Sequence, residues 1–407
     1  MKCRFCATEL NNVFLDLGSA PPSNAFVTED DLAKPELHFP LRLFTCRNCF
    51  LVQIDEVQKH DALFSNDYVY FSSFSSSWLA HSERYVATAT ERLGLDENSL
   101  VMEIASNDGY LLQYFMQSGI PCVGIEPTAS TAAAARQKGI ESLERFFGLA
   151  FANEFVTDRR PPDLIIGNNV LAHVPDINDF VAGLTKALAA EGVITLEFPH
   201  LMQLVAHGQF DTVYHEHFSY FSLHTVQQIL EAHGLRIWDL ETLPTHGGSL
   251  RLWICHRDAE RVATDAVENL RADEVRAGML EMDYYQNFQY RADAVKNGFL
   301  SFLLECKKNG KKVAGYGAAA KGNTLLNYAG VKPDLLPFVI DASPHKRGRY
   351  LPGSRIPVLT ENILRSIQPD FVVIFPWNLQ AEISEQLAYI REWNGQFVTA
   401  VPELKIQ

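Results

Sequence analysis

The densest group of proton-transferring side chains in this sequence is the run 214–222, which reads YHEHFSYFS. Tyr214, His215, Glu216 and His217 follow one another directly, and such residues can donate a hydrogen bond, orient a neighbour or accept a proton. The two histidines share no helical face, which excludes zincin chemistry. A metal site formed by both histidines and a purely structural network remain alternatives. We expect general acid–base catalysis here.

Two C-x-x-C pairs lie in the first 50 residues, Cys3 with Cys6 and Cys46 with Cys49. Each pair can place two thiolates on one tetrahedral zinc ion, and two pairs leave no open position for catalysis. The interval between them exceeds the usual spacing of about 15–20 residues, which an inserted loop explains. A redox or chance pair is the alternative, although a thioredoxin-like strand before the first pair is missing. We predict a structural zinc ion.

A loop with a single glycine, EIASNDG at residues 103–109, follows an apolar strand-like run and precedes a helix-like one. Loops at the carboxyl ends of strands bind ligands in α/β sheets. The G-x-G-x-x-G pattern of dinucleotide sites is missing. Glu126 ends the next strand, where an acid accepts hydrogen bonds from ribose hydroxyls. This order of features resembles class I S-adenosylmethionine methyltransferases; a doubly wound fold that binds another nucleotide is the alternative.

That resemblance implies which residues contact the cofactor. Asn168 and Asn169, at the end of the following strand, would flank its methionine end, and His173 would face the active site. Taken alone, His173 also fits a core or turn histidine without a catalytic role. The implied cofactor-binding residues in this part of the chain are Glu103, Ala105, Asn107, Gly109, Glu126, Pro127, Asn168 and Asn169.

Helix-like and strand-like segments alternate from about residue 82, which predicts a parallel sheet covered on both faces. LRIWDLETLP and SLRLWICH predict a terminal antiparallel pair joined by THGG, whose glycines permit positive φ. On this turn His246 either faces the pocket or is an exposed histidine without a role. KKVAGYG, LPFVID, DFVVIFP and QFVTAV predict the strands of a second α/β unit.

We therefore expect an α/β protein with a small N-terminal zinc module, a central class I methyltransferase Rossmann-like domain and a C-terminal second Rossmann-like domain. The expected divisions are a zinc module at 1–60, a lid segment rich in aromatic residues and serine at 61–81, the methyltransferase domain at 82–256, a helical connector at 257–309, and a nucleotide-sugar domain at 310–407. A strand or surface loop is the plainer interpretation of residues 67–81.

Four groups of motifs stand in a fixed order: the C-x-x-C pairs, EIASNDG with GIEP, YHEHFSYFS with THGGSLR, and GYGAAAKGNTLLN with FPWN. Together they resemble the zinc-containing C-methyltransferases that methylate carbon 3 of nucleotide-linked 4-keto-6-deoxy sugars. The resemblance implies that His217 is the base that forms an enolate. It places Tyr214 and His173 near the keto oxygen, and Glu216 as the residue that orients His217. Which of His215 and His217 is the base is not decided by the residues alone.

The same resemblance implies further contacts with the ligands. Tyr68 and Ser73 would contact the cofactor from the lid, and Tyr70 and His246 would contact the substrate. In the C-terminal domain, Lys321, Asn323 and Asn378 would bind the nucleotide sugar, with phosphate at a helix N-terminus. The nucleotide sugar would lie between the last two domains.

Composition limits the partners. The 407 residues carry a formal net charge of −14, which disfavours a nucleic-acid methyltransferase because phosphate binding needs a basic surface. No window reaches the roughly 18 apolar residues of a membrane helix, and the N-terminus has no apolar signal core. We expect a cytoplasmic monomer or weak oligomer acting on a small molecule. An O- or N-methyltransferase of another metabolite is the alternative function, and a degenerate, zinc-dependent binding protein is a further one.

Overall fold

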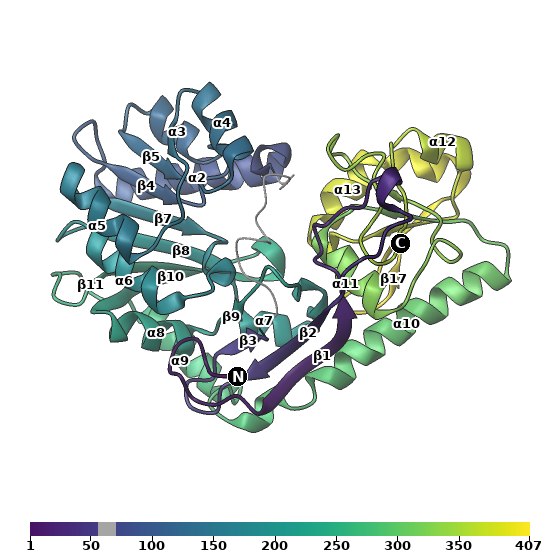
Figure 1. The fold of residues 1–407 in the computed structure, drawn as a ribbon, viewed down its shortest axis with the longest axis horizontal. Helices are drawn as coiled ribbons and strands as arrows, with labels where there is room; N and C mark the ends of the chain where they lie inside the picture. The colour runs from purple at the N-terminus through teal and green to yellow at the C-terminus, as the bar shows by residue number, and fades with distance from the viewer. Residues whose placement is uncertain (56–70) are drawn as a thin grey trace.

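The computed structural model describes residues 1–55 and 71–407, which contain three β-sheets. Figure 1 shows the central unit and the C-terminal unit side by side, with the N-terminal strands at the base between them. The long helix α10 (Phe288–Lys308) runs from this base along the C-terminal unit. The N-terminal strands therefore lie where the other two units approach each other.

The N-terminal sheet has the strand order β1-β2-β3-β9, and its neighbouring strands are antiparallel. Its first three strands precede residue 56, but the fourth comes from the middle of the chain. The elements are β1 (Asn12–Ala20), η1 (Glu29–Asp31), β2 (Phe39–Thr45), β3 (Val52–Ile54) and β9 (Ser219–Tyr220). A strand from the middle of the chain thus completes the sheet of the cysteine module.

The central sheet has the order β10-β11-β8-β7-β4-β5-β6, parallel from β8 to β6 and antiparallel at β8-β11-β10. This confirms the predicted parallel sheet and its terminal antiparallel pair. The inner strands β4 and β7 are buried along their whole length, as expected when helices cover both faces. The strands are β4 (Val101–Ile104), β5 (Cys122–Ile125), β6 (Glu141–Leu143), β7 (Leu164–Asn168), β8 (Val193–Pro199), β10 (Leu235–Leu243) and β11 (Ser249–His256).

The first helix of the central unit, α2 (Ser76–Leu93), starts earlier than the sequence indicated. The Ser75 hydroxyl caps it by accepting a hydrogen bond from the Trp78 amide, so the second half of the serine-rich stretch is helical and not a strand or loop. It ends at Gly94, which has a left-handed conformation. The other helices are α3 (Leu112–Gln117), α4 (Ala129–Gln137), α5 (Leu149–Asp158), α6 (Ile177–Ala187), α7 (Leu201–Ala206) and α8 (Leu223–Ala232).

The helices α9 (Asp265–Arg276) and α10 lead to the C-terminal unit, whose sheet has the order β14-β13-β12-β15-β16-β17. All neighbours in it are parallel except β16 and β17, so the predicted second α/β unit is confirmed. Its elements are β12 (Val313–Tyr316), α11 (Ala320–Tyr328), β13 (Val339–Ile340), β14 (Val358–Leu359), α12 (Ile363–Ile367), β15 (Phe371–Ile374), α13 (Gln380–Gln386), β16 (Gln396–Thr399) and β17 (Lys405–Ile406).

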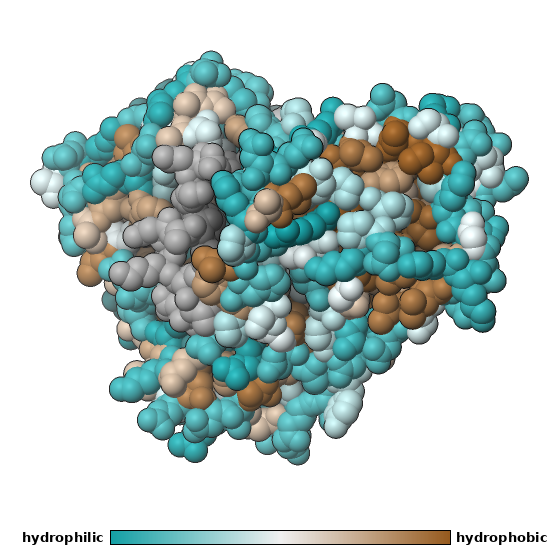
Figure 2. Space-filling model, turned by 45° about the vertical axis from the view of Figure 1, so that its right-hand side comes forward, coloured by the Kyte–Doolittle hydropathy of each residue, from teal (hydrophilic) through white to brown (hydrophobic). Residues whose placement is uncertain are grey.

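The surface is mixed in character. Figure 2 shows a mainly hydrophilic face with hydrophobic residues gathered in patches over the C-terminal unit. Of the helices in the described ranges, none has both the length and the apolar character needed to cross a lipid bilayer.

Candidate active site and zinc centre

The four cysteines of the two C-x-x-C pairs converge on one point, with all sulfur atoms within 4.8 Å of one another. The Sγ atoms of Cys6 and Cys46 are 3.5 Å apart, and those of Cys3 and Cys49 are 3.6 Å apart. A tetrahedral zinc ion with Zn–S bonds of about 2.3 Å requires sulfur atoms about 3.8 Å apart. The cluster therefore fits one closed, structural zinc site.

Both cysteine pairs adopt the same turn. Ala7 and Phe50, the residues after each pair, have positive φ, and their amides donate to the carbonyls of Cys3 and Cys46 at 3.0 and 2.9 Å. The repeated turn aims two thiols per pair at the same point. Local sequence spacing thus builds each half of the site, whereas the N-terminal sheet brings the halves together.

The loop after β4 has an unusual backbone. Ala105, Asn107 and Gly109 all have positive φ, and a Cβ at Gly109 would clash with the side chain of Ile140. The Glu126 carboxylate accepts hydrogen bonds from the Asn107 amide at 2.9 Å and the Thr128 amide at 2.8 Å. Glu126 therefore also holds the loop in shape, and half-buried Pro127 follows it at the start of the next turn.

Two buried polar side chains with little internal hydrogen bonding lie at the carboxyl ends of two neighbouring strands. The side-chain amide of Asn168 at β7 makes no hydrogen bond within the described residues, and the carboxyl group of Glu103 at β4 has Tyr110 as its hydrogen-bonding neighbour. Burial raises the pKa of Glu103 well above its usual value, and the Glu126 and Asp108 charges add to this, against a hydrogen bond from Tyr110. Because such groups are costly to bury unpaired, they indicate a polar ligand at this edge.

Of the three residues expected in the lid, the structure describes only Ser73. Tyr68 and Tyr70 lie outside the described residues. Ser73, in η2 (Ser72–Phe74), hydrogen-bonds to the Asp108 carboxylate, and the Lys138 ammonium donates to its hydroxyl at 2.9 Å. Ser73 is thus engaged with the loop that follows β4, and a cofactor contact would compete with these bonds.

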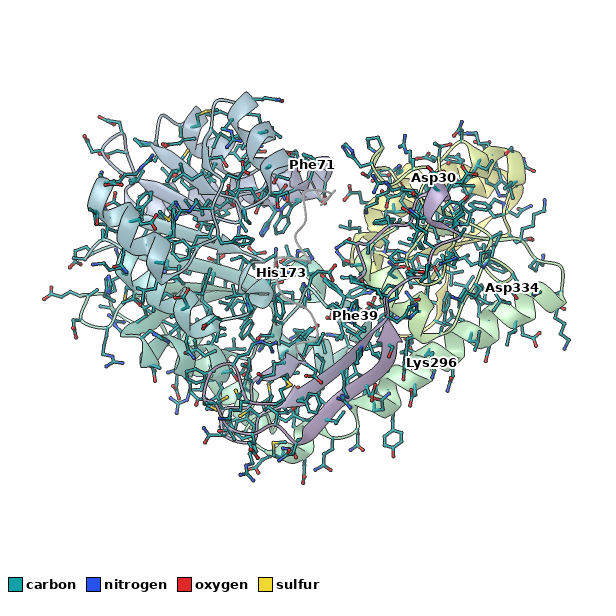
Figure 3. All side chains as sticks on the ribbon, in the orientation of Figure 1. Asp30, Phe39, Phe71, His173, Lys296 and Asp334 are labelled. Atoms are coloured by element: carbon teal, nitrogen blue, oxygen red, sulfur yellow. The ribbon has the colours of Figure 1, made fainter. Side chains whose placement is uncertain are left out.

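His217 lies at the centre of an aromatic cluster. Its ring centroid is 4.0 Å from that of Tyr214 and 4.6 Å from that of His173. Its Nδ1 lies 3.1 Å from the carbonyl oxygen of Thr212, which can only accept, so Nδ1 carries the hydrogen and Nε2 is the basic nitrogen. His173 likewise donates from Nδ1 to the carbonyl of Glu216 at 2.8 Å. Figure 3 shows His173 on the side of the central unit that faces the C-terminal unit.

The surroundings keep His217 unprotonated. Burial lowers the pKa of His217 well below its usual value, and the nearby His173, His246 and Lys321 lower it further, against the hydrogen bond to Thr212. A neutral imidazole with a free basic nitrogen is the form that a general base requires.

The expectation that Glu216 orients His217 is wrong for this structure. The Thr212 carbonyl does so, while Glu216 accepts a hydrogen bond from the side-chain amide of Asn24 at 3.2 Å. The reason is local geometry, because residues 215 and 216 form a tight turn closed by a 3.0 Å hydrogen bond from the His217 amide to the Tyr214 carbonyl. Neighbouring side chains on such a turn point in different directions.

His246 has a left-handed conformation on the 3-10 turn η5 (Thr245–Gly247). Its Nε2 lies 3.2 Å from the Asn169 side-chain amide, and its ring is 5.4 Å from that of Trp78. Burial and the Lys321 charge lower the pKa of His246 to about 4. Of the two alternatives for this residue, the structure favours the one in which it faces the site.

Of the three substrate residues expected in the C-terminal unit, Lys321 and Asn378 lie together, and Asn323 has a different partner. The Lys321 ammonium donates to the Asn378 side-chain oxygen at 2.8 Å and lies 4.3 Å from the Trp377 ring. The Trp377 indole in turn donates to buried Asp211 at 2.7 Å. Asn323 instead donates a hydrogen bond from its side-chain amide to the Ser23 carbonyl at 2.7 Å. This bond occupies the amide, which was expected to bind phosphate near the N-terminus of α11.

Sequence reasoning missed a buried cluster around Glu197, near the end of β8. Its carboxylate accepts hydrogen bonds from Arg251 at 2.6 Å and Thr245 at 2.9 Å, and lies 2.9 Å from Nε2 of His81. Thr245 belongs to the turn that carries His246, so Glu197 fixes that turn. A single acid within the apolar run VITLEFP was the available signal.

Comparisons with known proteins agree with this layout. A zinc-binding-domain model matches residues 3–64, a methyltransferase-domain model matches 78–240, and a model of the C-methyltransferase C-terminal domain matches 244–402. The C-methyltransferase NovU of Streptomyces niveus is 33% identical over 405 residues, covering 100% of this chain and 96% of NovU.

Solved structures resemble the chain only in part. Magnesium protoporphyrin IX methyltransferase of Synechocystis PCC 6803 has a TM-score of 0.34 at 16% identity, covering 44% of this chain and 81% of its own. The PH0226 protein of Pyrococcus horikoshii has a TM-score of 0.38 at 12% identity, covering 46% and 95%.

Proposed function

Because the chain belongs to the zinc-containing, S-adenosylmethionine-dependent C-methyltransferases, we propose that it methylates a nucleotide-linked 4-keto-6-deoxy sugar at a carbon beside the ketone, with carbon 3 as the expected position. The observation that carries this proposal is the geometry of His217. A neutral imidazole with its Nδ1 held by a backbone carbonyl offers Nε2 to an acidic C–H bond.

The proposed mechanism uses proton transfer by the chain's own residues. A ketone at carbon 4 acidifies the proton on the neighbouring carbon, and His217 Nε2 removes it. Tyr214, whose ring packs against His217, can donate its phenolic hydrogen to the keto oxygen as negative charge develops there, and His173, whose Nδ1 hydrogen is used by the Glu216 carbonyl, packs against His217 beside it. Bound S-adenosylmethionine would supply the electrophilic methyl group that the carbon takes up, with S-adenosylhomocysteine as the product. His217 keeps the proton until solvent takes it.

The cofactor in this proposal lies at the carboxyl ends of β4, β5 and β7. Glu126 accepts hydrogen bonds from the ribose hydroxyls, and the buried polar groups of Glu103 and Asn168 offer partners for the polar end of the cofactor. Ala105, Asn107 and Gly109 line it through their backbone, with Asn169 beside it. The four cysteines hold the structural zinc ion.

The nucleotide sugar in this proposal lies between the central and C-terminal units. Lys321, with Asn378 and Trp377 beside it, carries the positive charge that a diphosphate requires. The divisions 1–60, 61–81, 82–256, 257–309 and 310–407 remain predictions, but because α2 begins at Ser76, the last residues of the expected lid segment 61–81 belong to a helix of the central unit.

The test is to incubate the protein with S-adenosylmethionine and a panel of nucleotide-linked keto sugars in deuterated water. We expect one sugar to gain a methyl group on carbon, with NMR distinguishing carbon 3 from carbon 5, since both flank the ketone. His217→Ala should lose turnover by about 10²–10⁴-fold and keep cofactor binding. The control is His207→Ala, because His207 is exposed.

Normal rates in His217→Ala would remove it from the mechanism. Methylation on oxygen or nitrogen would refute the enolate chemistry. Cofactor binding without methylation or deuterium uptake for any sugar would refute the substrate class.

A further inference from the structure

The turn that carries the proposed base is attached to the N-terminal sheet. Strand β9 directly follows this turn and pairs with β3, with Val52 opposite Tyr220 and Gln53 opposite Ser219. The Ile54 amide also donates to the Phe218 carbonyl at 3.0 Å. The position of His217 therefore depends on the cysteine module as well as on the central sheet.

The segment between β1 and β2, residues 21–38, is anchored on the C-terminal unit; we call it the linking segment. Val27 and Tyr350 exchange backbone hydrogen bonds of 2.9 and 2.8 Å, and the Ser23 carbonyl accepts from Asn323. Figure 1 shows this segment against the C-terminal unit, and Figure 3 shows Asp30 within that unit's outline. The segment is thus held against the C-terminal unit at two points.

From this anchored segment, Asn24 reaches the proposed catalytic turn. Its side-chain amide donates to Oε1 of Glu216 at 3.2 Å. Glu216 is 3% exposed, and its Oε2 has no hydrogen bond within the described residues. On the other side of the turn, His215 Nε2 lies 3.3 and 3.2 Å from the carbonyls of Phe39 and Pro40. The N-terminal module therefore holds the turn at two consecutive side chains.

An unpaired oxygen on a buried carboxyl group is costly unless a ligand completes it. Burial raises the pKa of Glu216, and hydrogen bonds from its own backbone and from the side chain and backbone of Asn24 act against this. The titratable groups near Glu216 are its chain neighbours His215 and His217, His173, which donates to its carbonyl, and the Tyr220 phenol. Within the described residues, the side chain that hydrogen-bonds to the carboxyl oxygens is that of Asn24.

We propose that Asn24 is a positioning residue of the active site: from the linking segment it holds the Glu216 carboxyl group so that the second oxygen stays available to a hydroxyl group of the substrate. This deepens the proposed function and rests on it. It gives the N-terminal module a direct part in substrate recognition in addition to its zinc site.

The first experiment titrates Glu216 by carbon-13 NMR in the full-length protein without substrate, with its signal assigned by Glu216→Gln. Asn24→Asp keeps the size of the side chain but removes the donor and adds a like charge, and Asn24→Ala removes the donor alone. Both should raise the pKa of Glu216. Asn11→Ala, an exposed position in the same module, should leave it unchanged.

The second experiment measures kcat/KM against pH with the keto sugar that the panel identifies. We expect a fall of about tenfold to hundredfold in both Asn24 variants, an acid limb moved to higher pH, and unchanged zinc content and cofactor affinity. Asn24→Gln, which keeps an amide donor, should recover part of the loss.

An unchanged Glu216 pKa in Asn24→Asp would overturn the proposed contact. A kcat/KM and pH profile equal to those of Asn11→Ala would overturn the positioning role. If no keto sugar is methylated, the proposed function and the substrate-recognition role both fail, while the NMR titration still decides whether Asn24 holds Glu216.

Discussion

The charge of Lys321 should control the alkaline limb of the pH profile. Burial lowers the pKa of Lys321 to about 8, against the attraction of Asp211, so it loses its charge within the range in which the enzyme can be assayed. His217 titrates well below its usual value and stays neutral throughout this range. If Lys321 binds the diphosphate by its charge, kcat/KM should be flat near pH 7 and fall above about pH 8.

The size of the effect follows from the titration. One pH unit above its pKa, about a tenth of Lys321 is charged, so kcat/KM should be about tenfold lower, with a slope of one further decade per unit. Lys321→Arg stays charged and should remove this limb, whereas Lys321→Met should lower kcat/KM at all pH values. Asp211→Asn keeps an acceptor for Trp377 but removes the negative charge, and should therefore move the limb to lower pH.

The assay follows release of S-adenosylhomocysteine at low nucleotide-sugar concentration across this pH range. Lys308→Met, which removes an exposed lysine, is the matched control. An alkaline limb that is the same in Lys321→Arg as in the unmodified protein would refute the reasoning, since some other group would then be titrating.

Three further predictions concern the zinc ion and the cofactor loop. Cys49→Ala should lose bound zinc in elemental analysis and unfold at a lower temperature. The control variant Cys306→Ala should keep its zinc. Full zinc content in Cys49→Ala would contradict the four-cysteine site. In denaturant titrations, Gly109→Ala should lower the free energy of unfolding by about 1–3 kcal/mol more than Gly94→Ala. Both glycines have positive φ, but of the two only Gly109 has no room for a Cβ atom. Equal losses in the two variants would argue against the clash. Glu126→Ala should weaken S-adenosylmethionine binding about tenfold to hundredfold by calorimetry, and an unchanged affinity would exclude the ribose contact.

Much of the fold could be predicted from local sequence patterns. The spacing of Cys3 with Cys6 and of Cys46 with Cys49 predicts two zinc turns, because each turn depends on only five neighbouring residues. The alternation of buried strands with helices predicts two parallel sheets for the same reason, since periodicity is a local property. The start of α2 was misplaced because its N-cap, Ser75, stands in a serine-rich stretch where several residues could cap a helix.

The relative placement of side chains in the site needed the tertiary structure. The family resemblance implied that Glu216 supports its neighbour His217, whereas the fold gives that task to the carbonyl of Thr212 and directs Glu216 to Asn24. A backbone carbonyl is present at every residue, so no residue type reveals which one will be used.

The sequence by itself determined the residue types that can bind zinc, cofactor and proton, and the elements that carry them. Only the tertiary structure decided that β9 joins the N-terminal sheet and that the linking segment lies on the C-terminal unit. These arrangements depend on pairings between residues more than 150 positions apart, such as Gln53 with Ser219. Such contacts are set by packing of the whole chain and leave no periodic trace in the local sequence.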